Sequence, residues 1–210
     1  MKKFELTSET KINIFGKKLF RIKALISFAD VEAGETGGWV EKEGNVNQSG
    51  DAWVSGNAEV SDNAKVSGNA KVYGNAKVSG DAWVSGNAWV SGNAEVSGNA
   101  EVSGNAKVYG NAKVSGNAWV SGNAKVYGDA WVSGDAEVYG NADYTTIHGF
   151  GTQFRTTTFF RCKDKKVRVA CGCFFGTIPE FREQVKNTRK GKIAEEYLMI
   201  ADLMEKHFEK

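Results

Sequence analysis

The chain has 210 residues, 41% of them hydrophobic, and a formal net charge of +2. This hydrophobic content excludes an intrinsically disordered chain, and the small net charge points to no class of charged partner. The N-terminal residues lack the apolar run of a signal peptide, and no stretch is apolar enough to cross a membrane. Together with three cysteines, these features predict a cytoplasmic protein without a membrane partner.

Residues 1–49 are predicted to form a β-rich N-terminal cap. Lys11–Phe15 and Leu19–Ile26 are expected to pair as a hairpin across Gly16-Lys17, because apolar residues alternate along the second segment. A glycine-rich junction, Gly34 to Gly38, then leads into the repetitive part of the chain.

Residues 50–144 repeat one six-residue phrase, V-(S/Y)-G-(N/D)-A-x, without interruption. Valine recurs every sixth residue from Val54 to Val138, and an alanine lies two residues before each valine. The valine is expected to point inward from a short strand, while the glycine and the asparagine or aspartate turn the chain. Asp62 replaces the glycine once, and aspartate tolerates the same left-handed conformation.

This period predicts an all-β solenoid. Three hexads close one triangular coil of 18 residues, so fifteen hexads predict five coils stacked through parallel strands. Caps are expected at both ends, because an open solenoid end exposes unpaired strand edges.

Residues 145–210 are predicted to form a C-terminal hairpin followed by two helices. The hairpin runs from Thr156 to Cys173 and turns at residues 163–166. Thr177 and Glu180 form a capping box for a helix that extends to about residue 187. A second helix starts at Lys192, and its apolar stripe is expected to pack on the solenoid or the hairpin, with a groove for a partner helix as the alternative. The stripe consists of Ile193, Tyr197, Ile200, Met204 and Phe208.

Outward residues eighteen apart are expected to stack in columns. The residues that precede each valine form three columns: Trp53, Lys71, Trp89, Lys107, Lys125 and Asp143; Glu59, Lys77, Glu95, Lys113 and Trp131; and Lys65, Trp83, Glu101, Trp119 and Glu137. The second column alternates in sign, as expected for a ladder of cross-strand ion pairs.

One face of the predicted solenoid combines aromatic and basic residues, and we name it the aromatic-basic face. Such a surface suits a protein partner, a nucleobase or a sugar. The alternatives are cross-strand aromatic packing, a seat for the C-terminal helices, or an interface with an identical subunit. Its candidate binding residues are Trp53, Lys71, Tyr73, Trp89, Lys107, Tyr109, Lys125 and Tyr127.

The sequence gives little support for enzyme chemistry, and we predict no catalytic residue. Residues 50–144 contain no histidine and no insertion. His148 follows the last coil without an evident carboxylate partner nearby in sequence, which favours a structural role over that of a general base.

No cofactor or metal site is predicted either. Cys162, Cys171 and Cys173 with His148 would supply four zinc ligands, but the C-x-C spacing differs from the usual zinc knuckle. The excess of basic residues from Arg155 to Lys192 is interpreted as a solvated face balanced by the acidic last helix, with an anionic ligand as the alternative.

The repeat resembles the hexapeptide pattern of left-handed parallel β-helices, best known from trimeric acyltransferases. In Val54-Ser55-Gly56-Asn57-Ala58-Glu59 the aliphatic and the small inward positions match that pattern. The resemblance implies a left-handed solenoid. Hexapeptide acyltransferases generally use a histidine base and loops that interrupt the coils, and the repeats here contain neither.

Nearly the whole chain also resembles uncharacterised hexapeptide-repeat proteins of bacteriophages and prophages. The resemblance rests on the N-terminal Phe4-Glu5-Leu6-Thr7, on residues 37–43 and on two C-terminal segments, residues 156–161 and 171–174. It implies a phage-encoded protein in the host cytoplasm and transfers no catalytic residue.

These observations lead to one leading hypothesis and two alternatives. The leading hypothesis is a non-enzymatic solenoid, a homo-oligomer (trimer or dimer), that presents its aromatic-basic face to a partner and blocks or sequesters a host defence component. The first alternative is sequestration of a small anionic, nucleotide-like ligand between neighbouring subunits, and the second is acyl transfer. Nucleic acid is not an expected partner.

Overall fold

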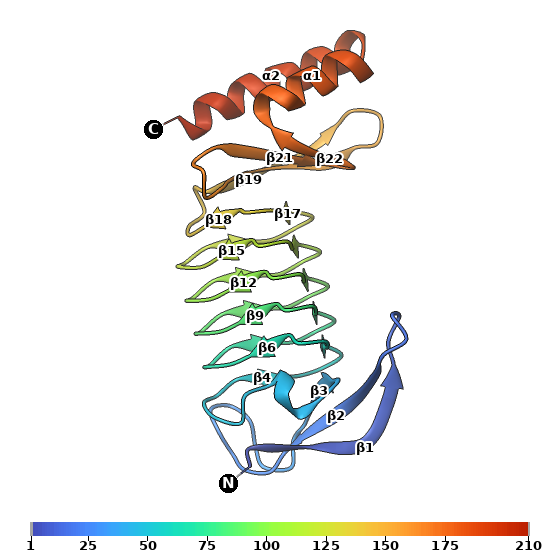
Figure 1. The fold of residues 1–210 in the computed structure, drawn as a ribbon, viewed down its shortest axis with the longest axis vertical. Coiled ribbons are helices and arrows are strands. Elements are labelled where there is room, and N and C mark those ends of the chain that lie inside the picture. Colours follow the sequence, from blue (N-terminus) through green and yellow to red (C-terminus); the bar gives the residue numbers. More distant parts are fainter. Residues whose placement is uncertain (1, 210) are drawn as a thin grey trace.

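The computed structural model describes residues 2–209 and shows an elongated solenoid between two caps (Figure 1). Fifteen strands of two residues each form its wall, and every third strand belongs to the same parallel sheet. The first face consists of β4 (Trp53–Val54), β7 (Lys71–Val72), β10 (Trp89–Val90), β13 (Lys107–Val108) and β16 (Lys125–Val126). The second face contains β5 (Glu59–Val60), β8 (Lys77–Val78), β11 (Glu95–Val96), β14 (Lys113–Val114) and β17 (Trp131–Val132). The third face contains β6 (Lys65–Val66), β9 (Trp83–Val84), β12 (Glu101–Val102), β15 (Trp119–Val120) and β18 (Glu137–Val138).

The predicted coil of 18 residues is confirmed by the strand register. Val54 lies opposite Val72, and Val90 lies opposite Val108, so each valine packs on the valine of the next coil. These valines and the alanines that precede them are buried and form one continuous core. Burial of many identical small groups stabilises the stack through apolar area and close packing.

Backbone hydrogen bonds join each coil to the next at the strands and at the corners. On the first face, Ser91 N donates to Val108 O at 2.9 Å, and Asn93 N donates to Gly110 O at 2.8 Å. The corner position requires a positive φ, which is +64° at Gly86 and +60° at Asp62. The interpretation of Asp62 as a tolerated replacement for glycine is therefore confirmed.

The N-terminal cap contains β1 (Phe4–Ile12), β2 (Lys18–Ala24), β3 (Thr36–Val40) and the 3-10 helix η1 (Glu43–Asn45). A hairpin forms as predicted, but its first strand ends at Ile12, so the predicted strand Lys11–Phe15 was wrong in extent. The side chain of Asn13 is the reason, because its Oδ1 accepts hydrogen bonds from the N–H groups of Phe15 and Lys17 and folds residues 13–17 into the turn.

The coil stack begins inside the segment that was predicted as cap. β3 pairs in parallel with β5, with Trp39 opposite Glu59, and Val46 forms an isolated parallel bridge to Val66. The stack also ends earlier than the repeat, because the last coil strand is β18. Ala142 is exposed and Asp143 lies outside the first column, so both were wrongly assigned to the coils.

The C-terminal cap is a four-stranded antiparallel sheet covered by two helices (Figure 1). It consists of β19 (Tyr144–Phe150), β20 (Arg155–Arg161), β21 (Val167–Cys171), β22 (Phe174–Thr177), α1 (Ile178–Thr188) and α2 (Gly191–Phe208). The predicted hairpin is confirmed as β20 and β21, and the predicted capping box at Thr177 is confirmed at the start of α1. The outer strands β19 and β22 were not predicted.

The apolar stripe of α2 packs on the C-terminal sheet and on α1. Tyr197, Ile200, Met204 and Phe208 are buried in one cluster with Phe159 and Phe181, and Ile193 packs against it. The expected packing on the hairpin is thus confirmed. Neither helix within residues 2–209 has the length and apolar character needed to cross a membrane.

Candidate functional site

The first face brings most of the predicted binding residues together. Trp89 lies between Lys71 and Lys107 in the parallel register, and Lys107 is followed by Lys125. The tyrosines that follow the valines of β7, β13 and β16 add to this face. The columns predicted from the period of eighteen are therefore confirmed within the solenoid.

Contacts between neighbouring coils hold these side chains. The Lys107 Nζ lies 4.2 Å from the centroid of the Trp89 ring, a cation–π contact. The rings of Tyr73 and Trp89 meet edge to face with centroids 6.3 Å apart. Tyr109 and Tyr127 stack with centroids 5.3 Å apart and an angle of 13° between the rings. Cross-strand aromatic packing, one of the alternatives, is thus present.

The packing leaves much of these aromatic rings in contact with solvent. Trp89 is 38% exposed and Tyr127 is 52% exposed. The C-terminal helices do not cover the face, because they lie beyond the last coil on the far side of the C-terminal sheet (Figure 1). A seat for these helices, another of the alternatives, is therefore excluded.

Trp53 does not belong to the exposed face, and its prediction as a surface residue was wrong. It is only 4% exposed, and the rings of Phe4 and Phe28 meet it edge to face at 6.2 and 5.4 Å. The N-terminal cap folds over the first coil and buries this indole. Its N–H has no hydrogen-bond partner among the described residues. Sequence columns cannot reveal this, because the covering residues lie outside the repeat.

A hollow of about 290 Å³ lies where the N-terminal cap meets the first face. Lys71, Tyr73, Trp89 and an edge of the buried Trp53 line it on the solenoid side, and Asp30 and Glu35 line it on the cap side. Lys71 Nζ donates to Asp30 Oδ1 at 2.5 Å, and this hydrogen bond lowers the pKa of the Asp30 carboxyl. The two carboxylates were missed from the sequence because no motif distinguishes them from other loop acids.

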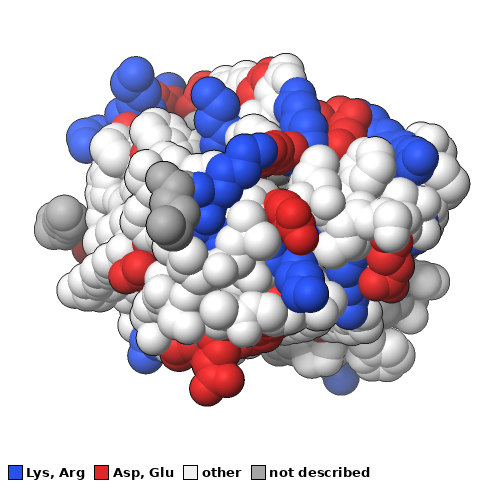
Figure 2. All heavy atoms as spheres, turned by 90° about the horizontal axis from the view of Figure 1, so that it is seen from below, with Lys and Arg blue, Asp and Glu red and all other residues white. Residues whose placement is uncertain are grey.

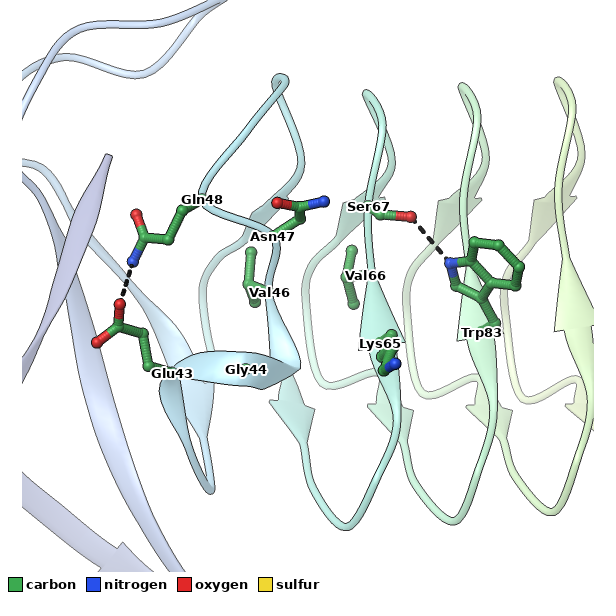
Figure 3. Close-up of a pocket in the computed structure, with 9 residues that line it drawn as sticks. All are labelled: Glu43, Gly44, Val46, Asn47, Gln48, Lys65, Val66, Ser67 and Trp83. Atoms are coloured by element: carbon green, nitrogen blue, oxygen red, sulfur yellow. Dashed lines mark hydrogen bonds between the residues drawn. The ribbon is translucent and has the colours of Figure 1, made fainter. Parts of the chain in front are cut away.

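A second hollow, of about 510 Å³, lies on the third face beside the N-terminal cap (Figure 3). The Trp83 indole N–H donates to Ser67 Oγ at 2.9 Å, which holds the indole across the neighbouring coil. Glu43 accepts from Gln48 Nε2 and from Lys2 Nζ, both at 2.9 Å, and these bonds lower the pKa of its carboxyl. The Glu43 carboxylate therefore has a structural use in the cap.

The charge ladder predicted for the second column is present in part. Lys113 Nζ lies 3.3 Å from Glu95 Oε2 on the adjacent coil. Glu59 instead pairs with Lys11 of β1 at 2.7 Å, because the N-terminal hairpin lies along this end of the second face. The exposed pair of Lys113 and Glu95 contributes little stability.

The residues considered for catalysis and metal binding do not form a common site. His148 Nδ1 lies 3.3 Å from Thr156 Oγ1 on the neighbouring strand. Cys162 is buried, Cys171 is partly buried and Cys173 is exposed, and all three are free thiols. Within residues 2–209, no three histidine, cysteine or acidic side chains gather as a metal site would require.

The end of the molecule that carries the N-terminal cap has a mixed charge pattern. Figure 2 shows lysine and arginine side chains interspersed with acidic ones on this end.

The repeats match one family profile, described as YdcK Beta solenoid repeat, at residues 70–86 and 106–122. A search of curated proteins finds no match. Both matched segments lie within the coils, where the strand register independently gives parallel stacking every 18 residues. The central part of the chain is therefore a β-solenoid with repeats similar to those of YdcK.

Proposed function

We propose that this protein is a non-enzymatic, phage-type β-solenoid that binds a host protein through its aromatic-basic face, acts as a homo-oligomer, and blocks or sequesters a host defence component. The observation that carries the proposal is the open stripe of Tyr73, Trp89, Lys107, Lys125 and the stacked Tyr109–Tyr127 pair, while Lys71 at one end of the stripe is paired with Asp30. This stripe combines exposed aromatic rings with lysines, the residue types that supply anchoring contacts and attraction for an acidic partner.

The rigid backbone of the solenoid supports this function. Each stripe residue is attached to a strand whose valine is fully buried, so its Cα position is held by the coil stack. Contacts such as Lys107 with Trp89 and Tyr109 with Tyr127 also restrict the side chains before binding. Preorganised side chains lose less conformational entropy when a partner binds.

The test compares two matched triple variants in affinity purification from the natural host cell. Replacement of Lys107, Trp89 and Tyr109 by alanine is expected to abolish recovery of the partner while thermal unfolding changes little. The control replaces Lys65, Trp83 and Trp119 of the third face by alanine and is expected to retain the partner. Equal recovery by both variants would contradict the proposal, and native mass spectrometry of the same samples reports the number of subunits.

A second candidate function is sequestration of a nucleotide-like ligand between the aromatic faces of neighbouring subunits. The nearly parallel stack of Tyr109 and Tyr127 favours it, because Tyr127 is half exposed and offers a planar platform for a base. A melting temperature that rises with added nucleotide, and a Tyr127→Ala variant that no longer responds, would support this function over protein binding.

A further inference from the structure

A third hollow, of about 520 Å³, lies where the second face meets the C-terminal sheet. Lys113 of β14 and Trp131 of β17 line it from the solenoid, and His148 and Arg155 line it from β19 and β20. Trp131 N donates to Thr158 Oγ1 at 3.0 Å, so the last coil and the C-terminal sheet are held in fixed positions around it. Its volume lies in the range of about 300–1,000 Å³ that is typical of small-molecule sites.

Two aromatic rings contribute to this hollow. The Trp131 indole N–H donates to Ser115 Oγ at 3.2 Å, which orients the indole, and the residue is still 36% exposed. Phe154 is 67% exposed, in the loop between β19 and β20. Both residues line the hollow, and exposed aromatic rings offer apolar surfaces on which a planar ring can stack.

The two cations at the hollow differ in their partners. Lys113 and Arg155 bring two positive charges, but Asp129 also lines the hollow, where it accepts a hydrogen bond from Asn111 Nδ2 at 2.9 Å, and Lys113 Nζ lies 3.3 Å from Glu95 Oε2. The other arginines of the C-terminal sheet, Arg161 and Arg168, pair with Asp143 and Asp164. Arg155 forms no such pair within residues 2–209, so its guanidinium is open to a ligand.

Gly172 makes room for the Arg155 side chain. Its φ is +61° in the turn between β21 and β22, and a Cβ at this position would overlap Arg155 Nη1 and lie 3.4 Å from Arg155 Cζ. The guanidinium therefore lies against the backbone of this turn, at the edge of the hollow. A guanidinium can bind phosphate oxygens through two parallel hydrogen bonds.

We propose that this hollow binds a planar ring that carries a phosphate, of the nucleoside monophosphate class. Trp131 and Phe154 stack with the base, Arg155 and Lys113 bind the phosphate, and His148 offers a further polar contact. No residue of the aromatic-basic face lines this hollow, so the proposal is independent of partner binding at that face.

The experiment measures binding of AMP to the full-length protein by isothermal titration calorimetry, with adenosine and inorganic phosphate as comparison probes. AMP is expected to bind at least about tenfold more tightly than either probe. Adenosine lacks the phosphate that the basic residues would bind, and inorganic phosphate lacks the base that the aromatic rings would contact. Equal binding of AMP and inorganic phosphate would overturn the role of the aromatic rings. Equal binding of AMP and adenosine would overturn the role of the basic residues, and absence of AMP binding would overturn the site.

Matched variants test the residues. Trp131→Ala is expected to weaken AMP binding about tenfold or more. The control is Trp119→Ala, because Trp119 has the same setting on the third face, with its indole N–H bonded to Ser103 Oγ at 3.1 Å, but lies outside the hollow. Equal loss in both variants would overturn the assignment.

Arg155→Gln is expected to bring AMP binding to the level of adenosine. If this variant fails to fold, Lys113→Gln on the solenoid replaces it and is expected to weaken AMP but not adenosine. Tyr127→Ala should leave AMP binding at this hollow unchanged, which separates the site from the nucleotide function considered for the first face.

Discussion

Trp83 donates its indole N–H to the hydroxyl of Ser67, sixteen residues earlier, at 2.9 Å. Because a coil has eighteen residues, this bond joins one coil to the preceding coil on the same face. Trp119 and Trp131 repeat it with Ser103 and Ser115. In other coils the residue sixteen positions before the tryptophan is not a serine, but the indole still lies against it. Trp89 contacts Tyr73 in this way, and Trp53 lies against Gly37.

The relationship between Trp53 and Gly37 predicts a strong effect of a single methyl group. A Cβ at position 37 would lie 2.5 Å from Ile22 Cγ1 and 2.6 Å from Trp53 Cζ2, in the buried junction of cap and coil. Gly37→Ala is therefore expected to lower the free energy of unfolding by about 3 kcal/mol. Urea denaturation measures this change. Gly44→Ala is the control, because nothing lies within 4 Å of a Cβ there, and an equal loss in both variants would contradict the packing argument.

The coil register predicts that deletions act according to their length. Removal of residues 68–85 deletes one complete coil and joins Ser67 to Gly86, so every following valine keeps its inward position. We expect a folded, shorter solenoid from this deletion. Removal of Lys71 alone moves the following valines out of register with the preceding coils and is expected to destabilise the protein strongly. Circular dichroism and thermal unfolding compare the two, and similar behaviour would contradict the coil assignment.

Ladders of asparagine side chains run along the corners and predict a stabilising substitution. Asn99 donates to Asn117, and Asn117 donates to Asp135, each at 3.0 Å, so both asparagine amides bond to the next coil. The Asp81 carboxylate accepts a hydrogen bond from Asn63 on the preceding coil. It has no N–H group to donate to Asn99 on the next coil, so the ladder is interrupted between Asp81 and Asn99. Asp81→Asn is expected to restore it and raise the free energy of unfolding by about 0.5 kcal/mol.

Asp129 offers the control for this substitution. It accepts from Asn111 at 2.9 Å, and no further coil follows it, so a new amide there has no acceptor in a next coil. Asp129→Asn should therefore leave the free energy of unfolding unchanged in the same chemical denaturation. A gain in both variants would point to the loss of negative charge as the cause.

The thiols are expected to differ in reactivity. Burial raises the pKa of Cys162 to about 11 from an ordinary value of 9.0, so its reactive thiolate is scarce at pH 8. Cys173 is exposed and should react first with iodoacetamide, as measured by peptide mass spectrometry, while all three thiols should react in denaturant. Faster labelling of Cys162 than of Cys173 in the folded protein would contradict its burial.

The same pKa shift gives a pH dependence of stability. The folded state keeps the Cys162 proton at pH values where the unfolded state loses it, so this group stabilises the fold fully below pH 9. The contribution is lost as the pH rises from 9 to about 11. Cys162→Ala should therefore show a smaller decline in unfolding free energy over this interval than the unchanged protein.

The repeat alone determined the solenoid, its coil length and its columns. Valine every sixth residue leaves only one periodic way to bury the apolar side chains, and the period then dictates which outward residues stack. The capping box at Thr177 and the hairpin of β20 and β21 were also predicted, because both depend on short-range sequence signals.

Only the tertiary structure decided how the two caps bury residues of the solenoid faces and supply them with new contact partners. The N-terminal cap buries Trp53, redirects Glu59 to Lys11 and brings Asp30 beside Lys71. The C-terminal sheet likewise brings Arg155 to the coil that carries Trp131. These contacts join residues outside the repeat to residues within it, so no periodicity encodes them. They depend on how the two ends of the chain fold over the open ends of the stack.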